Sequence, residues 1–212
     1  MSAVVIEPVI VERAIVEPAL IERVPIGGIG RRGMGWWGLV TLIATEGALF
    51  AYLLFAYYYL LVQFGPSWFP ERAPPLKLAL PNTIVLLVSS ATVWWAERSI
   101  RRGARGMALG GLALTFLLGL AFLIVQLFEW KAKPYTPQSG SYGSLYFTTT
   151  GFHMAHVAAG LIVLLLVFFW CLLGYLDDRR HVPLVIGAAY WHFVDVVWLT
   201  VFFTFYLLPR FW

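Results

Sequence analysis

Long runs of apolar residues, separated by short polar stretches, dominate the chain from residue 36 onward. Five runs can be marked, at about Trp36–Val62, Leu80–Ala96, Met107–Trp130, Tyr146–Tyr175 and Leu184–Leu208. A helix needs about 20 apolar residues to cross the hydrocarbon core of a bilayer, so each run can span it, the second only just. The pattern predicts an all-α, polytopic membrane bundle of five transmembrane helices.

Composition supports a membrane protein and excludes an ordinary water-soluble domain. Of the 212 residues, 60% are hydrophobic and 12% are charged, with a mean hydropathy of +0.78. Soluble domains carry about 25% charged residues. The single cysteine, Cys171, excludes an internal disulfide and a clustered cysteine metal site. The net charge of +4 reports loop topology, so no nucleic acid partner is expected.

The distribution of basic residues predicts a cytoplasmic N-terminus and an external C-terminus. With this orientation, the cytoplasmic side carries Arg13, Arg23, Arg31, Arg32, Arg98, Arg101, Arg102, Arg105, Arg179 and Arg180, and the outer side carries Arg72, Lys77, Lys131, Lys133 and Arg210. Cytoplasmic loops carry the excess of Lys and Arg in membrane proteins. An odd number of spans places the two termini on opposite sides.

Residues 1–35 form a separate unit ahead of the helical domain at residues 36–212. The segments IEPVIVERA and VEPALIERV repeat at an offset of ten residues, and Pro8, Pro18 and Pro25 disfavour a continuous helix. A glycine-rich hinge at Gly27–Gly35 follows. The segment is either a disordered tail or an extended cytoplasmic arm. We predict an arm that lies along the cytoplasmic face of a neighbouring subunit as an assembly clamp.

Polar residues inside the apolar runs are the candidate functional residues, because a charged group at the bilayer centre costs a few kcal/mol. They are Glu46 in the first run, Gln126 and Glu129 in the third, His153 and His156 in the fourth, and His192 and Asp195 in the fifth. At about 1.5 Å of rise per residue, Glu46, His156, His192 and Asp195 share a depth and can meet near the midplane. We predict a hydrogen bond between Glu46 and His156.

The spacing of the histidines leaves two interpretations open. His153 and His156, like His192 and Asp195, are three residues apart and share a helix face. Such groups can bind a metal or haem, or they can pair with carboxylates and carbonyl groups and hold helices together. Spacing alone favours the second interpretation. Separately, the arginines at positions 98, 101 and 105 are candidates for binding phospholipid headgroups.

Three motifs, in the expected order, resemble subunit III of the haem-copper oxygen reductases, the cytochrome c oxidase family. They are ATEGALFAYLLFAYYYL, TTTGFHMAHVAAG and YWHFVDVVWLTVFFTFYL, supported by LPNTIVLLVSSATVWWAER and GLAFLIVQLFEW. The resemblance covers about residues 36–208. Glu46 matches the buried glutamate of the family, His156 the second histidine of its F-H-x-x-H-V motif, and His192 and Asp195 its Y-W-H-F-V-D motif.

The resemblance implies a non-catalytic subunit in a proton-translocating respiratory oxidase. The chain itself is expected to hold no metal or haem: haem and copper are expected in subunit I, and subunit II is a further candidate for copper. Expected roles are to stabilise subunit I, to bind phospholipid and to support proton uptake. The partners implied are subunits I and II, with a larger supercomplex as a further candidate, in a bacterial plasma membrane.

Alternatives within and outside the family stay open. Longer family members carry two additional helices ahead of these five, where this chain has its arm. The electron donor can be cytochrome c or quinol, and a related protein accompanies nitric oxide reductases. Outside the family, the alternatives are a membrane haem or metal protein and a proton-coupled transporter. The sequence lacks the inverted repeat that is typical of many transporters.

Overall fold

Five long helices make up most of the structure, a computed structural model that describes residues 34–70 and 74–211. They are α1 (Met34–Phe64), α2 (Leu76–Arg101), α3 (Arg105–Lys131), α4 (Ser141–Leu172) and α5 (Val182–Phe202). Short turns are η2 (Pro66–Trp68), the π-helical η3 (Phe203–Leu207) and η4 (Leu208–Arg210). Each long helix is apolar enough to cross a membrane, which confirms the predicted five-span, all-α class. The predicted arm lies outside the described residues, apart from its last two, which begin α1.

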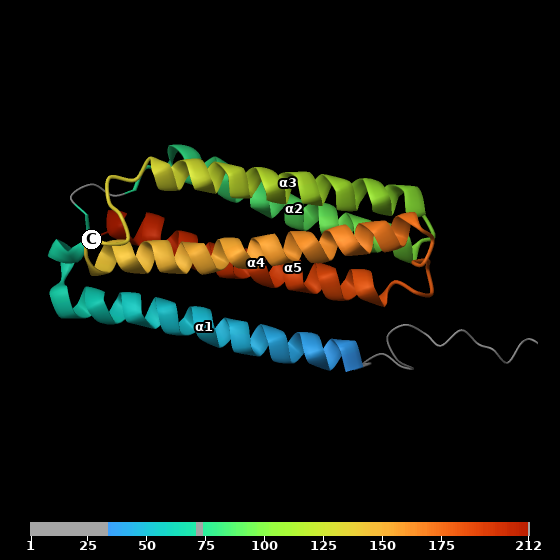
Figure 1. The fold of residues 1–212 in the computed structure, drawn as a ribbon, viewed down its shortest axis with the longest axis horizontal. Coiled ribbons are helices and arrows are strands. Elements are labelled where there is room, and N and C mark those ends of the chain that lie inside the picture. The colour runs from blue at the N-terminus through green and yellow to red at the C-terminus, as the bar shows by residue number, and fades with distance from the viewer. Residues whose placement is uncertain (1–33, 71–73, 212) are drawn as a thin grey trace, which may run out of the picture.

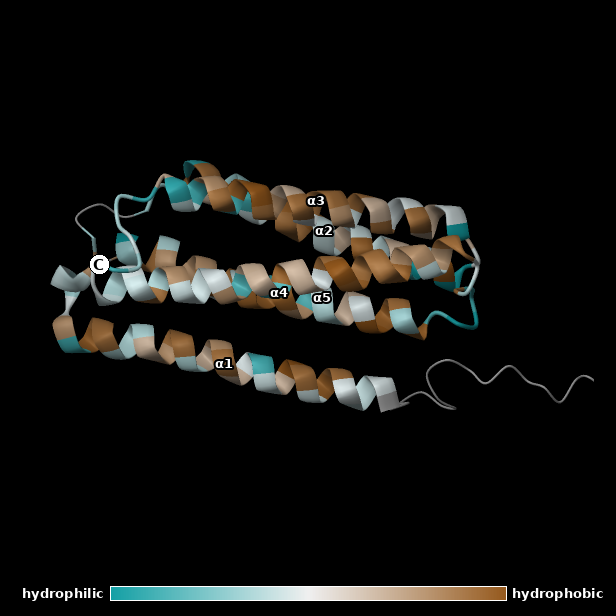
Figure 2. Cartoon of the chain, viewed as in Figure 1, coloured by the Kyte–Doolittle hydropathy of each residue, from teal (hydrophilic) through white to brown (hydrophobic). Residues whose placement is uncertain are grey.

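The helices run lengthwise in three layers (Figure 1). The α2–α3 pair lies on one side, α4 and α5 form the middle, and α1 lies on the other side against α4 and α5. The start of α1 and the C-terminus are at opposite ends of the bundle. Brown hydrophobic segments cover the middle of the helices, and teal polar residues gather mainly in the connections and at the helix ends (Figure 2). This distribution fits a bundle surrounded by lipid.

Helices α4 and α2 each end near a glycine with a positive φ, at positions that differ from the ends of the predicted apolar runs. The predicted fourth run extends to Tyr175, but α4 ends at Leu172 because Gly174 turns into the left-handed region, with φ of +85°. The N–H of Tyr175 then bonds the carbonyl of Trp170, and the N–H of Gly174 that of Cys171, which is a Schellman arrangement. Hydropathy shows where the apolar residues end, whereas the helix ends where the backbone of Gly174 adopts a positive φ.

Helix α2 is longer than the predicted Leu80–Ala96 run. It has 26 residues, begins before Pro81 and continues to Arg101, where Gly103, with φ of +73°, ends it in a second Schellman arrangement. Pro81 is the sixth residue of α2 and lies past its first turn, so the helix lacks one backbone hydrogen bond there, the one to the carbonyl oxygen of Lys77. The second span is therefore amply long, contrary to the prediction that it only just suffices.

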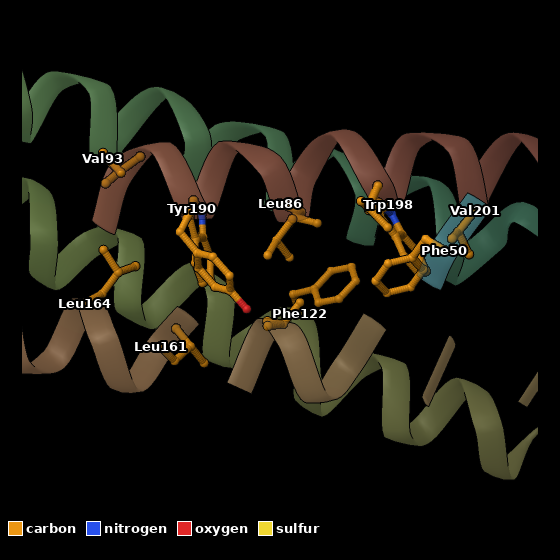
Figure 3. Packing of buried hydrophobic residues seen from close by; sticks show 14 of the residues in the cluster. Phe50, Leu86, Val93, Phe122, Leu161, Leu164, Tyr190, Trp198 and Val201 are labelled. Atoms are coloured by element: carbon orange, nitrogen blue, oxygen red, sulfur yellow. The ribbon is translucent and has the colours of Figure 1, made fainter. Parts of the chain in front are cut away.

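The core lies where α5 meets the other helices. Trp191 is fully buried, and a Cβ on Gly119 of α3 or Gly160 of α4 would lie within 3 Å of its ring. Toward the other end, Phe122 and Trp198 pack edge to face with ring centroids 4.9 Å apart. Figure 3 shows these two residues and Phe50 grouped in the interior. The large aromatic core fixes how α3, α4 and α5 are arranged.

Candidate functional site

The first candidate group is a polar pair between α1 and α4. Nε2 of His156 lies 2.9 Å from Oε2 of Glu46, so the predicted contact is confirmed. Nδ1 of His156 lies 2.6 Å from the carbonyl oxygen of Phe152 and donates its hydrogen there. Nε2 and Glu46 are therefore left to share a proton. The Glu46 side chain is 29% exposed and that of His156 is 13% exposed, so the pair reaches the outer surface of the bundle.

The second group lies between α2 and α5. Nδ1 of His192 is 2.6 Å from the hydroxyl of Ser90, and both residues are half-buried. Asp195, one turn further along α5, is buried, and neither of its carboxyl oxygens has a hydrogen-bond partner among residues 34–70 and 74–211. The Ser90–His192 hydrogen bond therefore joins α2 to α5 one helical turn from Asp195.

The predicted meeting of Glu46, His156, His192 and Asp195 in one place does not occur, because their helices pair differently. Glu46 and His156 join α1 to α4, while His192 bonds a residue of α2. His153 is fully buried beside Trp198, at a ring-centroid distance of 4.8 Å. Within the described part of the chain, no group of three His, Cys, Asp or Glu residues is arranged to hold a metal ion.

The third group is a buried ion pair near the loop between α3 and α4. Nζ of Lys133 donates to Oε1 of Glu129 at 2.8 Å, and both side chains are at most 3% exposed. The hydroxyl of Tyr206 donates to the same oxygen at 2.7 Å, and the hydroxyl of Tyr146 bonds that of Tyr206. The ammonium group also lies over both tyrosine rings, 5.0 and 4.7 Å from their centroids. Gln126 is fully buried one helical turn before Glu129.

Sequence reasoning missed Lys133, Tyr146 and Tyr206. Lys133 was counted only as a basic residue of an outer loop, although its position four residues after Glu129 is a signal for an ion pair. Nothing in the sequence indicates the π-helical turn Phe203–Leu207 that includes Tyr206. Such turns within helices are frequent at functional sites.

The three arginines proposed for lipid headgroups have different surroundings. Arg105 donates to the carbonyl oxygens of Cys171 and Leu172, at the end of α4. Arg101 forms an ion pair with Glu97, and the guanidinium of Arg98 lies 5.5 Å from the ring centroid of Trp94. Arg105 is thus used within the bundle, and Arg98 and Arg101 remain at the surface.

An apolar groove follows α1, α4 and α5. Three adjoining hollows make up this groove. The first two share the lining residues Val163 and Ile186, and the second and third share Trp170 and Pro183. The third hollow ends beside Arg180 in the α4–α5 loop. Arg180 there donates to Asp177, and this bond holds the pKa of the Asp177 carboxyl at about 2. The groove thus has apolar walls and one polar end.

Comparison with known proteins shows one family over most of the chain. The model of the cytochrome c oxidase subunit III family matches residues 29–210. Similar curated proteins include "Cytochrome c oxidase subunit 3" of Loxodonta africana (37% identical) and of Homo sapiens (36%), each aligned over 80% of this chain and 68% of the relative. The protein of the same name from Locusta migratoria is 34% identical, over 80% of this chain and 67% of the relative. The chain spans about two thirds of these relatives.

Proposed function

Because the chain belongs to the cytochrome c oxidase subunit III family, it is a membrane-embedded subunit of a terminal oxidase, and we propose that it acts by stabilising catalytic subunit I. In this role the chain carries no redox centre. Haem and copper belong to subunit I, and subunit II is a further partner and a further candidate for copper. We take the electron donor to be cytochrome c, as the names of the relatives suggest, with quinol as the alternative.

One observation carries the proposed docking role: polar pairs at mid-depth that are partly exposed on the outside of the bundle. Glu46 with His156 and Ser90 with His192 each reach a surface that is otherwise apolar. A polar group facing lipid is expensive. A neighbouring subunit that covers these pairs and offers hydrogen-bond partners removes that cost. Proton uptake supported by Glu46 is part of the same proposal.

Co-purification tests the assignment directly. The chain, tagged at its C-terminus and extracted in mild detergent, is expected to bring down a large haem-containing subunit in a fixed ratio. A tagged, unrelated membrane protein from the same cells is the control. Elution of the chain alone would overturn the proposal. A Soret band that stays with the separated polypeptide would favour the haem-protein alternative.

Replacing Glu46 distinguishes a hydrogen-bonding role from simple packing. Glu46→Gln keeps a partner for Nε2 of His156, whereas Glu46→Leu leaves that nitrogen unpaired at a cost of roughly 1 to 3 kcal/mol. We expect the leucine variant to lose subunit III from the washed complex, measured per haem, and the glutamine variant to retain most of it. Thr45→Val, at the neighbouring exposed position, is the control. Equal loss in both Glu46 variants would contradict this prediction.

Phospholipid binding is proposed at the groove along α1, α4 and α5 and at the surface arginines Arg98 and Arg101. The groove is apolar enough for an acyl chain. Clustered basic residues attract anionic headgroups by about 1 kcal/mol each. The bacterial plasma membrane is the proposed location of the complex.

Filling the groove should displace lipid. Val163 lines two of its hollows, so Val163→Phe is expected to lower the number of phospholipids retained in native mass spectra of the complex. Ile162→Phe, at the adjacent and more exposed position, should leave that number unchanged. Arg98→Ala with Arg101→Ala tests the headgroup site separately. Unchanged retention in the arginine variants would leave those residues with a topological role only.

A further inference from the structure

Two facing rows of polar and aromatic side chains line the interior between α3 and α4. The first row, on α3 and just after its end, contains Phe122, Gln126, Glu129 and Lys133. The second row, on α4, contains Tyr142, Tyr146, Thr149 and His153. In both rows the spacing is four, three and four residues, which keeps the helical members of each row on one face of α3 or α4. Lys133 follows two residues after the end of α3. The helices are antiparallel, so Lys133 faces Tyr146 near the loop and Phe122 faces His153 at mid-depth.

Many polar atoms in these rows have no protein partner. Both ring nitrogens of His153, Oε2 of Glu129 and Oγ1 of Thr149 are buried without a hydrogen bond to any described residue, and the buried amide of Gln126 lies beside the hydroxyl of Tyr146 without hydrogen-bond geometry to it. These four residues are at most 3% exposed. An unpaired buried polar group costs about 1 to 3 kcal/mol. So many in one place indicate that something else satisfies them.

The opposite seam of the bundle behaves differently. Between α2, α3 and α5, the indole N–H of Trp191 donates to the hydroxyl of Ser89 at 2.9 Å, and the hydroxyls of Thr92 and Thr115 bond each other at 2.7 Å. This seam also has glycines in close contact with neighbouring side chains. These four polar side chains are satisfied by protein atoms, so Trp191 serves as an internal comparison. Elsewhere on α5 and α2, both carboxyl oxygens of Asp195 and Oδ1 of Asn82 are buried without a partner among the described residues.

We propose that a line of bound water molecules runs between α3, α4 and the end of α5, from the Lys133–Glu129 pair to His153. The unpaired set includes donors and acceptors together, as an amide, an imidazole and a hydroxyl require, and water supplies both. The ion pair already balances its own charge, which disfavours an ionic ligand. Lys133 faces Tyr146, and the seven-residue rise from Tyr146 to His153 gives the line a length of about 10 Å.

Aromatic rings close the inner end of this line. The rings of Phe122 and Trp198 lie 5.8 and 4.8 Å from that of His153, and Phe50 adds a third at 6.4 Å (Figure 3 shows all three aromatic residues). The water line therefore gives His153 proton exchange with the Lys133 end of the bundle. The Glu46–His156 pair, which opens to the outer surface, lies beyond these rings.

Radiolytic labelling tests the water line in the intact, membrane-embedded complex. Hydroxyl radicals generated by an X-ray pulse oxidise buried residues only where bound water lies beside them. Tyr146 and Tyr206 border the proposed line, whereas Trp191, equally buried, lies in the opposite seam. We expect both tyrosines to be oxidised several-fold faster than Trp191, although indole is at least as reactive as phenol. Oxidation of the tyrosines no faster than that of Trp191 would overturn the proposal.

A variant distinguishes oxidation caused by bound water from oxidation caused by transient opening of the bundle. Gln126→Leu keeps a similar volume and removes both amide groups, so it should reduce the oxidation of Tyr146 several-fold. Thr115→Val removes a hydroxyl from the opposite seam of the same helix and should leave Tyr146 oxidation unchanged. Unchanged oxidation in Gln126→Leu would count against the water line. If that variant does not assemble, the wild-type comparison of Tyr146 with Trp191 decides the question alone.

Discussion

Replacing Lys133 with methionine is expected to lower the free energy of unfolding by about 3 kcal/mol, because it leaves a buried carboxylate without its counter-charge. Glu129 is 3% exposed and receives the Lys133 ammonium at 2.8 Å. Burial lowers the pKa of the Lys133 ammonium, and the charge of Glu129 opposes that shift. The methionine also loses the contacts of the ammonium with two tyrosine rings. Denaturation in mixed micelles, followed by tryptophan fluorescence, measures the change.

Two further variants make the Lys133 prediction specific. Adding Glu129→Gln to Lys133→Met removes the unbalanced charge and keeps an acceptor for the hydroxyl of Tyr206, so it should recover much of the lost stability. Lys131→Met, at an exposed position in the same turn, should change stability little. A double variant as unstable as the sum of its single changes would show that the charge pair is not the cause.

Placing valine at Gly111 should separate α2 from α3. A Cβ there would lie 2.8 Å from Cβ of Ala96 and 3.1 Å from both its Cα and the carbonyl oxygen of Thr92. Those are backbone positions, so only a shift of the whole helix can relieve the contact. Overpacking of this kind costs about 1 to 3 kcal/mol, and we expect Gly111→Val to reach the upper end.

Gly110 provides a matched control for the Gly111 variant. Nothing lies within 4 Å of a Cβ added at Gly110, so Gly110→Val carries the same change in helix propensity without the contact. Thermal unfolding of the two variants should differ by most of the Gly111 effect. Equal melting temperatures would show that α2 and α3 do not approach as closely as described. The pair of adjacent glycines thus separates backbone preference from interhelical contact.

The number of helices and the Glu46–His156 contact were predictable, because both follow from the cost of polarity in a bilayer. Hydropathy identifies spans, and an isolated glutamate at mid-depth requires a partner at the same depth. The sequence does not show which helices are neighbours, so the expected cluster of Glu46, His156, His192 and Asp195 divides between two interfaces. The burial of Lys133 also depends on tertiary structure, because a π-helical turn brings Tyr206 to it.

The tight turn between α2 and α3 affects how the protein is made. Only residues 102–104 connect the two helices, and the helices touch through Gly111 and Ala96. Arg98, Arg101, Arg102 and Arg105 surround this turn and resist transfer through hydrocarbon. We expect a hairpin so short, with a charged tip, to enter the bilayer as a preassembled unit during biogenesis. On this expectation, the ribosome completes both helices before either one is settled in the membrane.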